Sequence, residues 1–567
     1  MWDGGLCKDL PMAAERVGES DARGERAPVA GEHAPTGEHA PTEERADLRE
    51  LRERGRLTED AARPEAVARR HASGGRTARE NIADLVDPGS FVEYGRFAIA
   101  AQRQRRELRE LLERTPADGL VAGTARINGE LFGPERAACA VLSYDYTVLA
   151  GTQGALGHRK KDRLFELIER MRLPTVLFAE GGGGRPGDSD HPVVSALDTR
   201  AFALWARLSG LVPRIAVVKG RCFAGNAMLA GCADLIVATE DASIGMGGPA
   251  MIAGGGLGEV APDEVGPISV QAPNGVVDLV VADEAQAVAQ TRRLLGYFQA
   301  LVIPAAPGAA PDQTRLRELV PERERRAYPV APIVQTLADE GSVTFLRERF
   351  APEMLTALAR IEGRAVGVIA NDTRHAAGAI TSAGADKAAR HMQLCDAFGL
   401  PLISLVDTPG IMVGPQAETT ALVRHASRLL LAGAALRVPL VAVILRRGYG
   451  LGAQAMTAGS LHEPLLTVAW PGAHLGPMGL EGAVRLALRR ELEAIADVQE
   501  REQRVRELTA AAQENARALN AATLFELDDV IDPAQTRTAI AATLAAAASP
   551  AGEAAVARGA RRFVDSW

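Results

Sequence analysis

Two glycine-rich turns are the clearest candidates for catalytic chemistry in this 567-residue chain. Segments 222–228 (CFAGNAM) and 449–456 (YGLGAQAM) each lie between an apolar run and a helical pattern rich in Ala and Met. Glycine lets the backbone turn tightly, and two successive N–H groups at the start of a helix can stabilise a developing oxyanion. A single turn of this kind is more often a connection that binds nothing. Because two occur at duplicate positions, we interpret them as a pair of oxyanion holes.

The second turn also fits a dinucleotide-binding pattern. Residues 448–453 (GYGLGA) match GxGxxA and follow the apolar run 438–445. That fingerprint also needs an acidic residue about 20 positions later, at the end of the next strand. Here the next apolar run ends at Trp470 and Pro471, which disfavours a nicotinamide site.

Other catalytic motifs have no support in the sequence. It contains no HExxH, GxSxG or P-loop pattern, and its ten histidines lack metal-ligand spacing. We therefore expect no metal in this chain and no serine-hydrolase or ATP chemistry.

Basic residues gather at the start of one helical pattern, in the segment 158–163 (HRKKDR). Arg and Lys in this position can contact the phosphates of a ligand. An equally good interpretation is a solvated basic face of a helix. The glycine run 181–184, followed by Arg185, is a candidate anion-facing loop or a plain connection between a strand and a helix.

The sequence contains two similar copies of one segment pattern. LPTVLFAEGG begins at Leu173, and the similar segment LPLISLVDTPG begins at Leu400. We call the distance in numbering between these two leucines the repeat offset. The same offset relates Asp145 to Asp372, Lys160 to Lys387 and Gly225 to Gly452; these pairs are evidence of two homologous domains in tandem. A duplicated fold places two copies of one site about a pseudo-twofold axis, which suits a reaction between two similar partners.

Short apolar runs alternate with helical patterns in each copy, which predicts a buried, mainly parallel sheet. Glycine-rich segments follow the strands, where open α/β folds bind ligands. Residues 1–45 contain the direct repeat GEHAPTGEHAPT and are expected to be disordered. We place the two domains at 46–325 and 326–567, with a Pro- and Ala-rich connection within 301–330.

The composition excludes several classes of protein. A net charge of −8 argues against a broad nucleic-acid surface. No apolar run approaches the roughly 18–20 residues of a membrane span, and no export signal is visible. Five cysteines without a CxxC pair are typical of free thiols in a reducing cytoplasm.

Several longer segments together are similar to the carboxyltransferase (beta) subunit of biotin-dependent acyl-CoA carboxylases. The similarity covers roughly residues 66–540. The segments that carry it are 68–95, 220–239, 243–258, 360–372, 385–410, 467–487 and 528–537. This resemblance implies an α/β fold made of two crotonase-like (ClpP/crotonase) domains in tandem, with ββα spiral sheets flanked by helices.

The resemblance also implies the chemistry. The family transfers a carboxyl group from carboxybiotin to the α-carbon of an acyl-CoA thioester, and oxyanions develop on both partners. By this match the catalytic backbone groups belong to Gly225, Asn226, Gly452 and Ala453. The implied substrate-binding residues are Arg159, Lys160, Lys161, Gly183, Gly184, Arg185, Gly247, Gly248 and Ala455.

Two loops depart from the family pattern, at 183–187 and 452–456. The position that selects the acyl group, often an acid in the family, falls at Ala455, where a small apolar residue enlarges or neutralises the acyl pocket. The chain has no AMKM-like biotinyl motif and no ATP-binding half. Biotin is therefore expected on a partner biotin carboxyl carrier subunit, charged by a partner biotin carboxylase, around a homohexameric core in the cytoplasm.

Three alternatives remain open at this point. The first is a biotin-dependent acyl-CoA decarboxylase α-subunit that runs the exchange backwards. The second is a non-catalytic paralogue that scaffolds a working enzyme, suggested by the altered loops. The third is a crotonase-type hydratase or isomerase, which needs a carboxylate beside the hole; the run from Gly225 to Gly231 has none.

Overall fold

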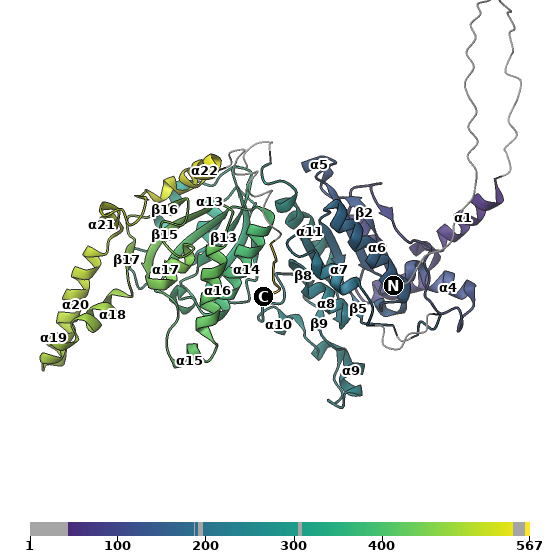
Figure 1. Ribbon diagram of the computed structural model, residues 1–567, viewed down its shortest axis with the longest axis horizontal. Helices are drawn as coiled ribbons and strands as arrows, with labels where there is room; N and C mark the ends of the chain where they lie inside the picture. The colour runs from purple at the N-terminus through teal and green to yellow at the C-terminus, as the bar shows by residue number, and fades with distance from the viewer. Residues whose placement is uncertain (1–43, 186, 191–196, 304–308, 548–561) are drawn as a thin grey trace, which may run out of the picture. The chain divides into compact units, whose positions relative to one another are not determined.

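The computed structural model describes residues 44–185, 187–190, 197–303, 309–547 and 562–567 (Figure 1). The predicted disorder of residues 1–45 therefore falls almost entirely outside the described residues. Helix α1 (Ala46–Arg56) begins immediately after that segment. Within the described ranges, no helix has the length and apolarity needed to cross a membrane.

The first copy is built on a seven-stranded sheet with the order β1-β2-β3-β4-β6-β8-β10. From β3 onward neighbouring strands are parallel, whereas β1 and β2 add antiparallel pairs at one edge. The central strands are buried along their length, as expected for a sheet covered on both faces. The strands are β1 (Val92–Glu93), β2 (Leu120–Arg126), β3 (Ala138–Tyr144), β4 (Thr175–Phe178), β6 (Arg214–Val218), β8 (Leu235–Thr239) and β10 (Leu279–Val281).

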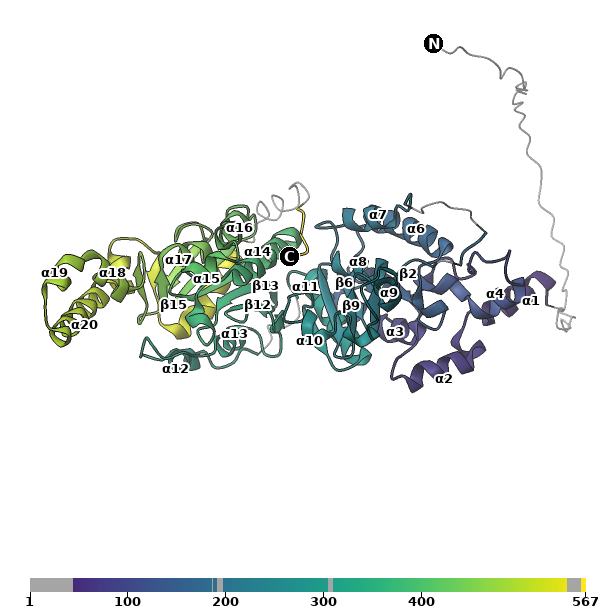
Figure 2. The same cartoon turned by 90° about the horizontal axis from the view of Figure 1, so that it is seen from below.

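Helices cover both faces of this sheet (Figure 2). On one face, α6 (Ala155–Met171) and α7 (Ala201–Arg207) pack on alternate side chains of the strands. On the other face, α3 (Ala78–Leu85) and α11 (Glu284–Gln299) pack on the remaining side chains. Three short strands that come after β4, β6 and β8 in the chain form a separate parallel sheet. Helix α8 (Gly225–Gly231) begins after the central strand of this sheet. Its strands are β5 (Gly181–Gly182), β7 (Arg221–Phe223) and β9 (Ser243–Gly245).

The second copy repeats this plan with the order β11-β12-β13-β14-β15-β16-β18, and β17 pairs with the end of β15. Strand β15 is long because it continues through the segment that corresponds to β6 and β7 of the first copy. The strands are β11 (Thr344–Leu346), β12 (Met354–Ile361), β13 (Arg364–Asn371), β14 (Leu402–Thr408), β15 (Leu440–Tyr449), β16 (Leu466–Ala469), β17 (His474–Gly476) and β18 (Asp529–Val530).

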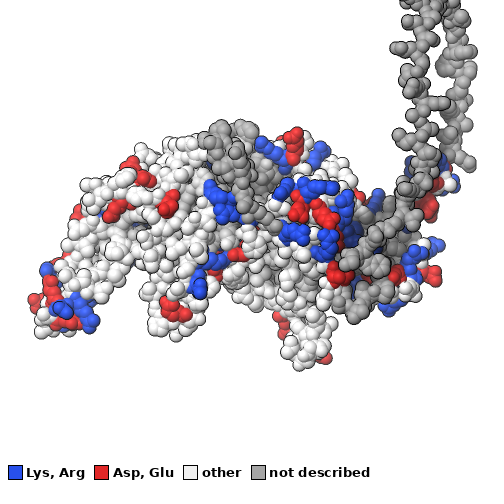
Figure 3. All heavy atoms as spheres, viewed as in Figure 1, with Lys and Arg blue, Asp and Glu red and all other residues white. Residues whose placement is uncertain are grey.

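The principal helices of the second copy are α14 (Ser382–Phe398), α16 (Leu422–Ala434) and α17 (Gly450–Met456). A hairpin of α18 (Leu480–Ala487), α19 (Arg489–Ala494) and α20 (Val498–Asn515) carries acidic and basic residues side by side at its tip (Figure 3). The other helices are α2 (Pro64–Ala72), α4 (Leu108–Arg114), α5 (Gly129–Phe132), α9 (Pro249–Gly254), α10 (Ile268–Gln271), α12 (Leu316–Leu319), α13 (Ala331–Leu337), α15 (Pro415–Glu418), α21 (Ala518–Thr523) and α22 (Thr536–Ala547).

Strand register confirms the duplication and locates a shift within it. Thr175 of β4 pairs with Arg214 of β6, and Leu402 of β14 pairs with Leu440 of β15. Thr175 and Leu402 are related by the repeat offset, whereas the distance in numbering between Arg214 and Leu440 is one position shorter than that offset. The second copy therefore has one residue fewer between these strands, and positions from β15 to the start of α17 correspond with an offset that is shorter by one.

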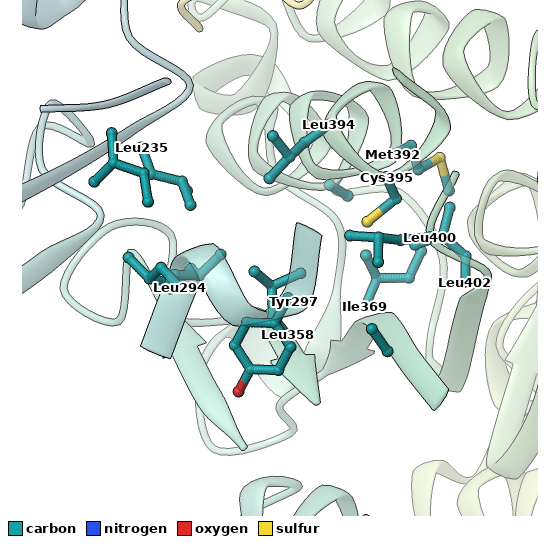
Figure 4. Close-up of a cluster of buried hydrophobic side chains, with 14 of the residues drawn as sticks. Leu235, Leu294, Tyr297, Leu358, Ile369, Met392, Leu394, Cys395, Leu400 and Leu402 are labelled. Atoms are coloured by element: carbon teal, nitrogen blue, oxygen red, sulfur yellow. The ribbon is translucent and has the colours of Figure 1, made fainter. Parts of the chain in front are cut away.

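A single hydrophobic cluster contains residues of both copies (Figure 4). It includes Leu235 and Leu294 from the first copy and Leu358, Ile369 and Met392 from the second. Separate clusters lie under α6 and α7 and under α13 and α22. The shared cluster indicates that the two copies are packed together as one folded body.

Candidate functional site

The first glycine-rich turn joins β7 to α8 through Ala224, whose φ of 50° and ψ of −119° are rare for a residue with a side chain. Strain of this kind concentrates at functional sites. The first intrahelical bond runs from Met228 N to Ala224 O, at 2.9 Å. The N–H groups of Gly225 and Asn226 precede that bond and have no acceptor within the helix. The structure therefore brings these two predicted residues together as a pair of N–H donors.

Close packing explains the residue types in this turn. A Cβ at Gly225 would lie 2.8 Å from Gln153 Nε2 and 3.2 Å from Phe202 Cζ, so a side chain there would displace its neighbours. The Asn226 side chain is buried, and its Nδ2 donates to Gly151 O (3.1 Å) and Glu180 O (2.8 Å). Close packing at Gly225 and the side-chain hydrogen bonds of Asn226 therefore both hold the turn in place.

The second turn corresponds to the first with a shift of one position from the sequence prediction. Phe223 pairs with Gly245 in one copy, and Tyr449 pairs with Gly476 in the other. Gly450, with φ 57°, then takes the place of Ala224, with φ 50°.

This correspondence changes the donor pair that we assign to the second copy. Leu451 and Gly452 match Gly225 and Asn226. Ala453 matches Ala227, the residue that follows the donor pair of the first copy. The geometry thus favours Leu451 and Gly452 over the predicted pair Gly452 and Ala453. Sequence matching at the repeat offset paired Gly225 with Gly452 instead, because the one-residue shift lies between β14 and β15.

Gly452 is held against the loop after β14. A Cβ at this position would lie 2.6 Å from Gly410 Cα and carbonyl carbon, and 3.0 Å from Ile411 N. Helix α17 can approach that loop only if residue 452 has no side chain. The predicted acyl-selecting residue, Ala455, is fully buried in the shared core. The exposed side of α17 is instead formed by Leu451, which is 62% exposed, and Gln454.

The predicted basic cluster divides between surface and core. Arg159 is exposed on α6, whereas Lys160 and Lys161 are buried. Gly157, Lys160, Lys161, Leu164, Phe165 and Ile168 share the buried face of α6. Their spacing of three and four positions is that of a core-facing helix stripe, and this spacing was the signal in the sequence that these lysines point inward.

Lys160 and its duplicate Lys387 support backbone turns. Lys160 Nζ donates to Ala117 O (3.0 Å) and to Leu120 O. Lys387 Nζ donates to Arg347 O (2.9 Å) and Phe350 O (2.7 Å). Burial lowers the pKa of Lys160 to about 8 and that of Lys387 to about 7. The duplicated lysine thus has the same kind of structural contacts in both copies.

Arg185 is also enclosed by the protein. Its guanidinium forms a buried ion pair with Asp118, lies 3.6 Å from Asp188, and donates to Thr152 O at 3.0 Å. The two preceding glycines belong to the same loop: Gly183 N donates to Phe223 O at 3.3 Å, and Gly184 forms a β-bridge with Gln153. This loop lies beside the first turn through its contact with β7.

Gly247 and Gly248 connect β9 to α9. A Cβ at Gly248 would lie 3.1 Å from Cδ2 of the Phe223 ring, and one at Gly247 would lie 3.5 Å from Met251 Cβ. Because β9 pairs with β7, this loop is a neighbour of the first turn.

Buried carboxylates paired with arginine lie next to the first turn and at the duplicate position, and we did not predict them as site residues. Glu180 accepts from both terminal nitrogens of Arg70, at 2.7 and 2.6 Å. Its duplicate, Asp407, accepts from Arg446 Nε at 3.0 Å and Arg447 Nε at 2.7 Å. These two acids are related by the repeat offset, which was visible in the sequence. Within the described part of the chain, no group of three or more His, Cys, Asp or Glu residues is arranged to hold a metal ion.

Comparison with known proteins places this geometry in a family. The carboxyl transferase domain matches residues 69–562. The chain is 32% identical over 489 residues to the methylmalonyl-CoA carboxyltransferase 12S subunit of Propionibacterium freudenreichii subsp. shermanii, covering 84% of this chain and 89% of that protein. A solved transcarboxylase 12S structure, described as a hexamer assembly with methylmalonyl-coenzyme A bound, has a TM-score of 0.78 at 29% identity and covers 91% of this chain and 97% of that one.

A further solved structure is more similar in sequence. It is a single-chain, multi-domain long-chain acyl-CoA carboxylase, 55% identical with a TM-score of 0.84, matched over 88% of this chain. This chain spans 49% of the length of that protein, and 89% of the 12S subunit. The chain belongs to the carboxyl transferase family of biotin-dependent acyl-CoA carboxylases. It is an enzyme of that type with a crotonase-like fold, which confirms the prediction from the sequence.

Proposed function

We propose that this chain transfers a carboxyl group to the α-carbon of a long-chain acyl-CoA. The observation that carries this proposal is the pair of matching strand–turn–helix sites, one in each copy, that present Gly225 and Asn226, and Leu451 and Gly452. Each pair of N–H groups suits an oxygen that gains negative charge during the reaction. Two such sites suit a reaction in which both partners develop an oxyanion.

The two pairs have separate roles in this proposal. Gly225 and Asn226 hold the thioester oxygen and stabilise its charge while the α-carbon is the nucleophile. Leu451 and Gly452 hold the ureido oxygen of biotin, whose contribution when bound is the carboxyl group. Backbone donors that are fixed before the reaction need no reorganisation as charge develops, and removal of one such donor typically costs roughly 2.7–4 kcal/mol of barrier.

The long acyl chain is proposed from two observations. The 55% identity to a long-chain acyl-CoA carboxylase is well above the 32% identity to the 12S subunit. Apolar side chains also remain exposed beside the turns: Met228 on α8 is 43% exposed and Leu451 on α17 is 62% exposed. Such surface can contact an alkyl chain.

We propose a homohexamer that acts with partner biotin carboxylase and biotin carboxyl carrier components, by analogy with the hexamer assembly of the 12S relative. In this proposal the CoA part of the substrate is bound by Arg159 on the surface and by the loops at 183–185 and 247–248. The four cysteines within the described ranges are free thiols, which supports a location in the reducing cytoplasm.

The test is a chain-length series. The purified chain is given 2-carboxyacyl-CoA substrates from malonyl-CoA to carboxylated palmitoyl-CoA, with and without free biotin, and decarboxylation is followed. We expect biotin-dependent loss of the carboxyl group, with the largest kcat/KM for the longest acyl chains. A preference for malonyl-CoA or methylmalonyl-CoA would contradict the long-chain assignment, and turnover that ignores biotin would contradict carboxyl transfer.

A further inference from the structure

We propose that Lys161 and Gln153 are positioning residues for the first oxyanion turn and act on it through the side chain of Asn226. The inference rests on the proposed function, because the proposed function gives the first turn its role as an oxyanion hole. It concerns side chains that make no contact with the exposed surface of the site.

A continuous line of hydrogen bonds joins the three side chains. Lys161 Nζ donates to Gln153 Oε1 at 2.6 Å, and Gln153 Nε2 donates to Asn226 Oδ1 at 2.6 Å. Asn226 Nδ2 then donates to Gly151 O and Glu180 O. All three side chains are buried, and Lys161 is only 1% exposed. Hydrogen bonds in such a chain polarise one another, most strongly away from water.

The surroundings of Lys161 leave the Gln153 side chain as the hydrogen-bond acceptor of its amine. The Tyr144 and Phe202 rings lie 5.7 and 5.9 Å from Nζ. Asp162 and Asp118 are the acids that act on it electrostatically. Among the residues that the structure describes, no carboxylate lies within ion-pair distance of Nζ. Gln153 is thus the side chain that receives the hydrogen bond of this buried amine.

Gln153 also connects the loops around the turn. Its backbone N donates to Gly183 O at 2.8 Å, and its backbone O accepts from Arg185 N at 3.0 Å. Its side-chain amide is the group that a Cβ at Gly225 would strike. A displaced Gln153 would therefore shift both the loop at 183–185 and the N–H groups of Gly225 and Asn226.

The second copy lacks this line of side chains. The residues that correspond to Gln153, Lys161 and Asn226 are Ile380, Ala388 and Gly452. There the turn is held by direct packing of Gly452 on the Gly410 backbone. This line of hydrogen bonds from Lys161 through Gln153 to Asn226, which we call the relay, is therefore specific to the turn that we assign to the thioester.

The experiment compares Lys161→Met and Gln153→Leu with Lys387→Met. Lys387 is a suitable control because it is a buried lysine of the same type, 3% exposed, that donates only to the backbone carbonyls of Arg347, Phe350 and Ala351, none of which belongs to either turn. Each full-length variant is assayed for biotin-dependent decarboxylation of the preferred 2-carboxyacyl-CoA, per mole of folded enzyme. Hydrogen exchange is measured in parallel on peptides that cover 221–231 and 448–459.

We expect Lys161→Met and Gln153→Leu to lower kcat at least tenfold, with a smaller rise in KM for the acyl-CoA through the loop at 183–185, and the double variant to be no worse than either single one. Exchange should rise in 221–231 and stay unchanged in 448–459. Lys387→Met should lower thermal stability but keep kcat within twofold. Equal losses of kcat in Lys161→Met and Lys387→Met, or unchanged exchange in 221–231, would overturn the proposal. If the wild type itself shows no biotin-dependent turnover, the proposed function fails, and the exchange data still decide whether the relay holds the turn.

Discussion

At the scale of single residues, the second oxyanion pair gives a direct contrast between Leu451 and Ala453. Leu451→Pro removes one N–H group from the first turn of α17, where proline is tolerated. We expect kcat for carboxyl transfer to fall about 10²–10³-fold, the usual effect of losing one oxyanion donor. Leu451→Ala keeps the N–H group and is the matched control for the lost donor: kcat stays close to that of the wild type, and the shorter side chain affects only KM for the long-chain acyl-CoA. Equal activity in the two variants would remove Leu451 from the donor pair.

The protonation of Lys161 gives a second test at this scale. Burial lowers its pKa from 10.5 to about 7. Between these values the unfolded chain binds a proton that the native state lacks, so the free energy of unfolding rises with pH, by about 1.4 kcal/mol per pH unit. In Lys161→Met this contribution is absent. Urea unfolding of both proteins from pH 7 to about 10 should therefore give a difference in stability that grows with pH. Parallel pH profiles would show that Lys161 titrates normally.

At the scale of elements, the approach of α17 to the loop after β14 depends on Gly452. Gly452→Ala would place a Cβ 2.6 Å from the Gly410 backbone, so the helix or the loop must shift. Since a misplacement near 1 Å can cost about 100-fold in rate, we expect a large loss of kcat. Gly472→Ala is the control, because a Cβ there meets nothing within 4 Å. Unchanged kcat in Gly452→Ala would show that the turn tolerates displacement.

The elements also show what the sequence could and could not predict. The tandem repeat, the alternating strands and helices, and the two turns were all visible as sequence patterns. The buried lysines were misplaced because charge was weighed above the spacing of Gly157, Lys160 and Leu164 on α6. The shortened offset was present in the sequence, where the segment that begins at Val212 matches the one that begins at Val438. Strand pairing showed that this offset continues into the second turn, so that Leu451 matches Gly225.

At the scale of the whole molecule, the two copies are joined by buried polar contacts as well as the shared core. Arg347 Nε of the second copy donates to Asp278 Oδ1 of the first at 2.9 Å, and both side chains are buried. Asp278→Ala would leave a buried guanidinium without its carboxylate, which typically costs about 3–5 kcal/mol. We expect that loss in chemical denaturation. Glu481→Ala, which breaks the exposed pairs of Glu481 with Arg325 and Arg485, should cost less than about 1 kcal/mol. Similar values for the two variants would show that this contact does not hold the copies together.

The central claim is that this chain moves a carboxyl group between an acyl-CoA and biotin with one oxyanion turn from each copy. The most direct measurement follows an isotopic label from the carboxyl group of a long-chain 2-carboxyacyl-CoA to free biotin, with the full chain as the only protein. The account predicts that label appears on biotin together with an equal amount of decarboxylated acyl-CoA, and that Leu451→Pro slows both. Label released only as CO₂, at a rate that is the same without biotin, would contradict it.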